Sequence, residues 1–191
     1  MSPEPFADIL DENETLLWTG KPNRRVWMSS GYVWLSIGIV WGILIVLMLF
    51  AFIQDVMHNG HSPPLEFLCI MMVLVPLFHG SPCWGSILYM YWLHCAEKKT
   101  VYACTDKRVL IKRGGFGVSY ITIHYGDIRD VTVRVGWFEN RCKTGTLLFE
   151  TGALQPMLFG IAYWNLKRFT GIETPYVVAK MIDTHMQAAK K

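Results

Sequence analysis

The sequence predicts a membrane α+β protein, in which a two-helix transmembrane hairpin precedes a curled antiparallel β-sheet capped by a C-terminal α-helix. Three observations predict this class. Residues 31–53 contain no Asp, Glu, Lys, Arg or His, and residues 67–95 contain no Asp, Glu, Lys or Arg. After residue 99 the sequence changes to short alternating segments separated by turns, as in antiparallel sheets. The final segment carries apolar side chains at helical spacing.

The two uncharged stretches are long enough to cross a bilayer. A hydrocarbon core of about 30 Å needs about 20 apolar residues in a helix. We expect spans at about residues 32–53 and 67–95, joined by an outside loop at residues 54–64. The second stretch is interrupted by Pro76 and by a His-Gly-Ser-Pro sequence at residues 79–82, and proline kinks or breaks a helix. One long kinked helix is favoured here, and an interfacial segment followed by a shorter span is the alternative.

The distribution of cations predicts the orientation. Lys21, Arg24 and Arg25 precede the first span, Lys98 and Lys99 follow the second, and the connecting loop has no Lys or Arg. Positively charged flanks stay on the cytoplasmic side. We therefore expect both termini in the cytoplasm. The first apolar stretch is too long for a cleavable signal peptide and is interpreted as an uncleaved anchor.

Alternating segments predict strands at residues 100–105, 108–113, 118–124, 128–135 and 145–151, with a further one at 157–164. A helix is expected from Pro175, because apolar residues then recur every three or four positions. Near the N-terminus, Leu16, Leu17 and Trp18 form a short β-compatible segment. A segment this short is not stable alone, so we expect it to dock on the sheet.

Several motifs occur in an order that resembles a known family. Residues 14–22 are ETLLWTGKP, residues 101–111 are VYACTDKRVLI, residues 128–133 and 145–149 are IRDVTV and GTLLF, and residues 169–177 are FTGIETPYV. Together they resemble bacterial membrane proteins with a bacterial pleckstrin-homology (bPH) domain and an N-terminal transmembrane hairpin. The resemblance implies a cytoplasmic segment at 1–30, a hairpin at 31–97 and a cytoplasmic PH-like domain at 98–191. It also implies the bacterial inner membrane as the location.

The C-terminal part is basic. Residues 96–191 carry fifteen Lys or Arg against eight Asp or Glu, an excess of seven positive charges. Cations beside a membrane favour anionic lipids, and a Gly-Gly loop can turn backbone N–H groups toward an anion. The candidate lipid or anion site consists of Lys107, Arg108, Lys112, Arg113, Gly114 and Gly115. The alternative is a solvated face that contacts anionic lipid without selectivity. Nucleic acid is not expected as a partner, because a membrane-anchored basic domain is explained more simply by lipid.

Four aromatic side chains in the C-terminal part are candidates for a partner surface. They are Trp137, Phe138, Tyr163 and Trp164. Such residues could pave a groove for a peptide or a second copy of the chain, and burial in the core is the alternative.

No catalytic or cofactor motif is present: the sequence lacks a P-loop, GxGxxG, GxSxG and HExxH. The five cysteines show no CxxC spacing, so we expect no metal site and no cofactor. The prediction is a non-enzymatic scaffold module, tethered to the membrane, that binds an unknown protein or forms a homo-oligomer. The alternative is sensing of anionic lipid headgroups by the basic hairpin. A third hypothesis is an accessory role in transport or catalysis built on His79 and Pro82 in the second span.

Overall fold

The computed structural model describes residues 5–7, 9–59, 64–151, 157–158, 161–162 and 167–189. The chain forms two compact units. The first, here called the sheet unit, contains Met1–Trp27 and His94–Lys191. The second, here called the helical unit, contains Met28–Leu93. The sheet unit is α+β, with antiparallel sheets and a C-terminal helix, as the sequence predicts.

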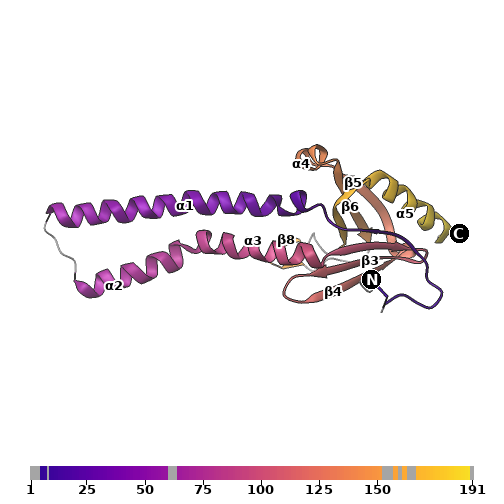
Figure 1. Cartoon of the computed structure of the whole chain (residues 1–191), viewed down its shortest axis with the longest axis horizontal. Helices are drawn as coiled ribbons and strands as arrows, with labels where there is room; N and C mark the ends of the chain where they lie inside the picture. The colour runs from indigo at the N-terminus through magenta and orange to yellow at the C-terminus, as the bar shows by residue number, and fades with distance from the viewer. Residues whose placement is uncertain are drawn as a thin grey trace. The chain divides into compact units, whose positions relative to one another are not determined.

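The first sheet of the sheet unit combines one strand that precedes the apolar helices in the sequence with three strands that follow them. Its order is β1 (Leu16–Gly20), β2 (Val101–Thr105), β3 (Arg108–Gly114) and β4 (Val118–His124). Figure 1 labels β3 and β4 of this sheet. All neighbours are antiparallel. Strand β1 lies at the edge and pairs Thr19 with Ala103 of β2. The Leu16–Trp18 segment is therefore a strand of this sheet.

The second sheet contains β5 (Ile128–Arg134), β6 (Thr144–Thr151) and β9 (Arg168–Glu173) in the order β5-β6-β9. A 3₁₀ turn, η2 (Tyr125–Asp127), connects β4 to β5, and the short helix α4 (Trp137–Arg141) connects β5 to β6. The small pair β7 (Met157–Leu158) and β8 (Ile161–Ala162) precedes β9.

Strand β9 and helix α4 are differences from the sequence prediction. The sequence predicts no strand at residues 169–177, between the last expected strand and the helix from Pro175. Most of it is instead a strand paired with β6, with Leu147 opposite Phe169. Gly171 interrupts the alternation of side chains, so the sequence does not show a strand pattern here. In the structure its φ is +62°. Glycine adopts this left-handed conformation without the steric cost of a Cβ.

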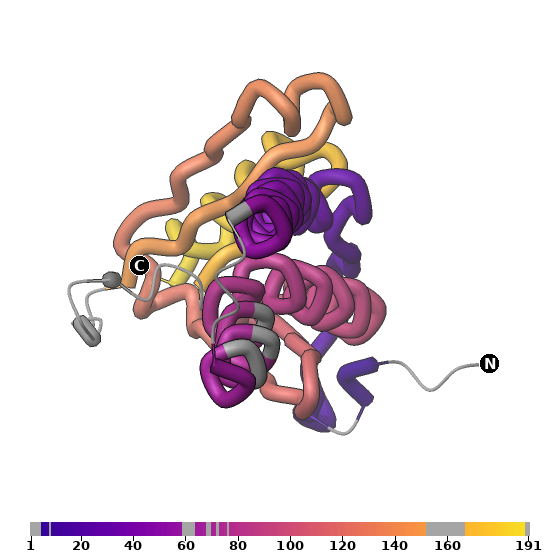
Figure 2. The backbone as a smooth tube through the Cα atoms, turned by 90° about the vertical axis from the view of Figure 1, so that its left-hand side faces the viewer, coloured from indigo at the N-terminus to yellow at the C-terminus, as the bar shows by residue number. Residues whose placement is uncertain are grey.

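Helix α5 (Pro175–Ala189) packs on the second sheet, beside β5 and β6 (Figure 2). It buries one face, made by Val178, Ile182 and Met186. Phe169 on β9 lies at the centre of the core and is fully buried. Its ring stacks on Tyr102 of β2 at 4.6 Å between ring centroids and meets Phe149 of β6 edge-on at 4.9 Å. Aromatic contacts thus join the two sheets around one residue.

Four helical segments carry the apolar stretches: α1 (Arg24–Asn59), α2 (Leu65–Leu74), the π-helix η1 (Val75–His79) and α3 (Ser81–Lys99). Within the described residues, one helix, Arg24–His58, is long and apolar enough to cross a membrane by length and composition. The second stretch is two α-helices joined through η1, which contains Pro76. Proline lacks an N–H and donates no helical hydrogen bond, and at the end of η1 Gly80 donates to the carbonyl of Val75, five residues back.

The helical unit is held together by small residues. Gly38 of α1 lies so close to Ser86 and to the Pro82 carbonyl of α3 that a Cβ would collide with them. The Cys83 thiol donates to the Gly38 carbonyl at 3.2 Å, and the Trp41 indole donates to the His79 carbonyl at 2.7 Å. Glycines allow helix backbones to approach closely in this way. The part of α3 in this unit thus packs directly on α1.

Candidate functional site

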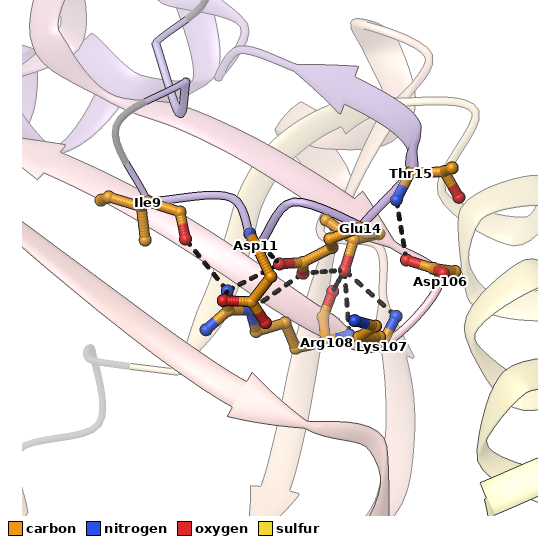
Figure 3. A network of polar contacts seen from close by, with 8 residues as sticks. Ile9, Asp11, Glu14, Thr15, Asp106, Lys107 and Arg108 are labelled. Carbon is orange, nitrogen blue, oxygen red and sulfur yellow. Dashed lines mark hydrogen bonds and ion pairs between the residues drawn. The ribbon is translucent and has the colours of Figure 1, made fainter.

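A carboxylate–guanidinium pair lies at the turn between β2 and β3 (Figure 3). The Arg108 guanidinium donates from Nε to Glu14 Oε1 at 2.9 Å and from Nη2 to Glu14 Oε2 at 2.6 Å. The Glu14 side chain is fully buried and that of Arg108 is 13 % exposed. Nη2 also donates to the carbonyl of Ile9 and lies 3.5 Å from Asp11 Oδ1. The pair therefore fixes the segment before β1 to the start of β3.

This geometry determines the ionisation of Glu14. Hydrogen bonds from Arg108, opposed by burial and assisted by the Thr105 hydroxyl, lower the pKa of Glu14 from 4.5 to about 2. The same hydrogen bonds raise the pKa of Arg108. Both groups are charged at neutral pH. A two-pronged contact of this kind is among the stronger hydrogen-bonded pairs in proteins.

Thr105 and Asp106 complete the turn. The Thr105 hydroxyl donates to Glu14 Oε1 at 2.6 Å and accepts from the backbone N–H groups of Lys107 and Arg108. Asp106 accepts at Oδ1 from the backbone N–H of Thr15 at 3.0 Å. A carboxylate in a Thr-Asp turn is expected to bond its own turn. Here the Thr105 hydroxyl bonds the turn, and the Asp106 carboxylate joins the turn to Thr15, the residue before β1.

The six residues of the predicted anion site do not come together. Lys107 and Arg108 lie at one end of the β2–β3 hairpin, and Gly114 and Gly115 lie at the other. Gly114 lies six positions after Arg108 along the strand, about 20 Å at 3.3 Å per residue. The guanidinium of Arg108 moreover donates hydrogen bonds to the Glu14 carboxylate. The six residues are therefore distributed along the hairpin, and anion binding by those that share one of its ends stays a prediction.

Lys112 and Arg113 also have other surroundings, on opposite faces of β3. The Lys112 ammonium lies 5.4 Å from the centre of the Tyr120 ring and donates to the Pro5 carbonyl at 3.4 Å. Arg113 lies near Tyr102 and Arg168. Burial, followed by the like charge of Arg113, lowers the pKa of Arg168.

The Gly114–Gly117 loop is closed by its own backbone and by a lysine. The Gly115 N–H donates to the Gly117 carbonyl at 2.9 Å, so this N–H is not free for an anion. The Lys99 ammonium donates to the Gly115 carbonyl at 3.2 Å. The Lys99 side chain lies where a Cβ on Gly114 would stand, which explains the glycine there. This loop thus contacts the last residue of α3, and Phe116 at its tip is 88 % exposed.

Helix α4 presents two aromatic side chains. Trp137 is 74 % exposed and Phe138 is 40 % exposed. The Arg141 guanidinium stacks over the Trp137 ring at 4.8 Å, and the Glu139 carboxylate accepts from the Gly136 N–H at 2.7 Å and from the Thr146 hydroxyl. Tyr163 and Trp164, the other two predicted surface residues, lie outside the described residues.

Trp18 lies against the core, and its indole stacks on Phe169 with ring centroids 5.7 Å apart. Leu16 packs against a second apolar cluster around Phe6, Val101 and Leu110, while Leu17 is 43 % exposed. Sequence reasoning missed Glu14 as a structural residue, although it opens the motif at 14–22. The only signal was an acidic residue immediately before a β-compatible segment, with no indication of its partner.

Within the described residues, no group of three or more His, Cys, Asp or Glu is placed to hold a metal ion. The fold and these contacts define an α+β module of antiparallel sheets closed by a C-terminal helix. The family described as Bacterial PH domain matches residues 26–181, and the chain belongs to this family. PH domains are in general interaction modules for lipids or proteins, without catalytic activity. No curated protein and no solved structure matches the chain significantly.

Proposed function

We propose that this protein is an interaction or scaffold module tethered at the cytoplasmic face of a bacterial inner membrane. Helix α1 leads outward across the bilayer and the α2–η1–α3 run returns through it. The sheet unit binds a protein partner or a second copy of the chain. In domain terms, residues 1–30 and 98–191 are cytoplasmic and residues 31–97 form the hairpin.

One observation supports the proposal that the chain crosses the membrane twice. Strand β1 precedes α1 and pairs with β2, which follows α3. A folded sheet stands on one side of a membrane, because an unpaired backbone inside lipid is too costly. If α1 crosses the bilayer, the chain must therefore cross again before β2. The α2–η1–α3 run is the segment available for the return, although its interruption at η1 keeps it from qualifying as a single long apolar helix.

Two further features support the hairpin and its orientation. The small-residue contacts of Gly38 and Cys83 are of the kind that pack membrane helices. The cations of both flanks, together with a loop at 54–64 that lacks Lys and Arg, favour cytoplasmic termini. Tethering of the module raises its effective concentration for any partner at the same membrane.

Topology is tested with reporter fusions. Alkaline phosphatase, which is active only outside the cytoplasm, is fused after Asn59 in one fusion and after Lys191 in another. The proposal expects activity after Asn59 and none after Lys191, with a fluorescent-protein fusion at Lys191 as the positive control. Activity at Lys191, or none at Asn59, would contradict the two crossings.

The interaction role is tested by isolating the tagged full-length chain from native membranes in mild detergent. Mass spectrometry then identifies the co-purified proteins and lipids. One recurring protein at fixed stoichiometry, or a defined homo-oligomer, supports the scaffold role. A monomer that carries one enriched anionic lipid would replace it with lipid sensing.

A further inference from the structure

Within the sheet unit, the residues that begin α1 and those that end α3 lie at the same end of the sheets. Gly20, the last residue of β1, pairs with Tyr102 near the start of β2, so α1 begins beside the place where α3 ends. The Asn23 N–H donates to the Gly171 carbonyl at 2.8 Å, which ties the start of α1 to β9. Lys99, the last residue of α3, contacts the loop after β3. We call this part the helix-joining end. It comprises residues 20–27, 94–101, 114–118, 134–146 and 171–177.

Most of the exposed large hydrophobic side chains described in the sheet unit lie at this end. Strand β3 runs back toward Lys99, which brings the tip of the β3–β4 hairpin there. Gly145 pairs with Ile172, which brings α4 and the start of α5 to the same end. Leu17 and Tyr120 are exposed elsewhere. The side chains at the helix-joining end are Phe116, Val118, Val135, Trp137, Phe138, Tyr176 and Val177.

Cations accompany these apolar side chains. Lys98 and Lys99 occupy the last turn of α3, and Lys99 contacts the loop that carries Phe116. Arg141 covers one face of the Trp137 ring, and Lys143 follows α4. Tryptophan beside basic residues is characteristic of membrane–water interfaces, where the ring lies at headgroup level and the cation meets anionic lipid.

The lengths of the helices place this end close to the bilayer in the proposed topology. The uncharged run of α1 begins at residue 31, seven residues after Arg24, or about 10 Å at 1.5 Å per residue. The second uncharged run ends at Cys95, four residues before Lys99, or about 6 Å. Each headgroup layer is about 5–7 Å thick. Lys99 at the end of α3 therefore lies at the level of the headgroups, and Arg24 at the start of α1 lies just beyond them.

We infer that the helix-joining end is a bilayer-binding surface, which inserts Phe116 and Trp137 among the headgroups of the anionic cytoplasmic leaflet. This inference rests on the proposed function, because the hairpin supplies the tether. It assigns Trp137 and Phe138 to lipid instead of a protein partner. The sheet unit then lies on the membrane in a defined orientation and leaves its opposite end, with the Lys107 turn, open to partners.

The test uses the full-length chain in liposomes with an environment-sensitive fluorophore on a single introduced cysteine. Cys69, Cys83, Cys95 and Cys142 are replaced by serine. Cys104 stays, because it is fully buried and burial raises the pKa of its thiol. The labelled variants are Phe116→Cys, Trp137→Cys and Lys107→Cys. Lys107 is the matched control, because it is exposed at the far end of the hairpin. A fourth variant, Val46→Cys, reports on α1.

Lipids carrying a spin-label quencher at headgroup depth should quench the fluorophore at residues 116 and 137 several-fold more than at residue 107. Equal quenching at the three positions would overturn the inference. A quencher deep in the acyl chains should act on residue 46. Loss of that quenching would mean that α1 does not cross the bilayer, which is a failure of the proposed function. Quenching at residue 46 without quenching at 116 and 137 refutes the inference alone.

The charge of the lipid is tested on the same samples. In liposomes with about one-third phosphatidylglycerol, quenching at residue 116 should exceed that in purely zwitterionic liposomes, and added salt should reduce the difference. Equal quenching in both lipid mixtures, with residue 46 unchanged, would show that the cations do not contribute and would overturn the anionic part of the inference.

Discussion

Glu14 and Arg108 are 94 residues apart in the chain, and their side chains meet at 2.6 Å. Two apolar helical stretches lie between them. The pair thus joins the segment of the sheet unit that precedes these helices to the segment that follows them. Glu14 lies before residue 26, where the match to the Bacterial PH domain family begins. A segment outside the family match therefore completes the fold.

Glu14→Ala should destabilise the sheet unit by about 3 kcal/mol, because it leaves the mostly buried Arg108 without its main partner. The measurement is thermal unfolding of the purified full-length protein, followed by near-UV circular dichroism. Glu12→Ala is the control, because Glu12 is exposed two residues away. Equal losses in both variants would argue against the pair as the origin of stability.

The stability contributed by Glu14 should depend on pH. The pKa of Glu14 falls from 4.5 to about 2 on folding, so the contribution is complete above about pH 4.5 and is lost as pH falls toward 2. A shift of this size corresponds to about 3 kcal/mol. The stability difference between the native chain and Glu14→Gln should therefore shrink between pH 6 and pH 2.5. A constant difference across that range would show that Glu14 is not held ionised by Arg108.

Trp18→Ala should loosen the sheet unit and leave membrane insertion intact. The indole stacks on Phe169, and its loss removes partly buried aromatic contacts worth about 2 kcal/mol. Limited proteolysis should cut the region 100–191 faster, while the amount of protein in the membrane fraction stays the same. Leu17→Ala, on the exposed face of the same strand, is the control. Unchanged protease resistance in Trp18→Ala would count against this role.

Gly171→Ala should cost about 1–2 kcal/mol of stability. Its φ of +62° is unfavourable for alanine, and a Cβ there would lie 3.1 Å from Val26 Cγ1. Gly126→Ala is the control, since nothing lies within 4 Å of a Cβ at that position. Thermal unfolding of the two variants side by side gives the comparison, and a Gly171→Ala variant as stable as Gly126→Ala would refute the prediction.

Gly38→Val should separate α1 from α3 within the helical unit, because its side chain would collide with Ser86 and the Pro82 carbonyl. Size-exclusion chromatography after a heating series in detergent should show a lower midpoint for loss of the monodisperse peak. Gly85→Val lies in α3 with nothing within 4 Å of its Cβ, so it should behave like the native chain. Similar midpoints for both valine variants would contradict the close helix packing.

Elements with a local pattern can be predicted from the amino-acid sequence alone. Uncharged runs of more than twenty residues predict the long apolar helices, because a missing charge needs no partner to be recognised. Alternation predicts β3, β4 and β5, and the spacing from Pro175 predicts α5. The motif order also indicated the bacterial PH family, to which the chain belongs.

Features that depend on residues far apart in the chain become visible only in the folded protein. Strand β9 is too irregular to recognise without its pairing to β6, and Glu14 became significant only when Arg108 approached it. Arg108 and Gly114 of the predicted anion site are close in the sequence, but the extended strand β3 places them at its opposite ends. A local pattern indicates the conformation of a segment, whereas the packing of the whole chain determines which strands pair and which side chains meet.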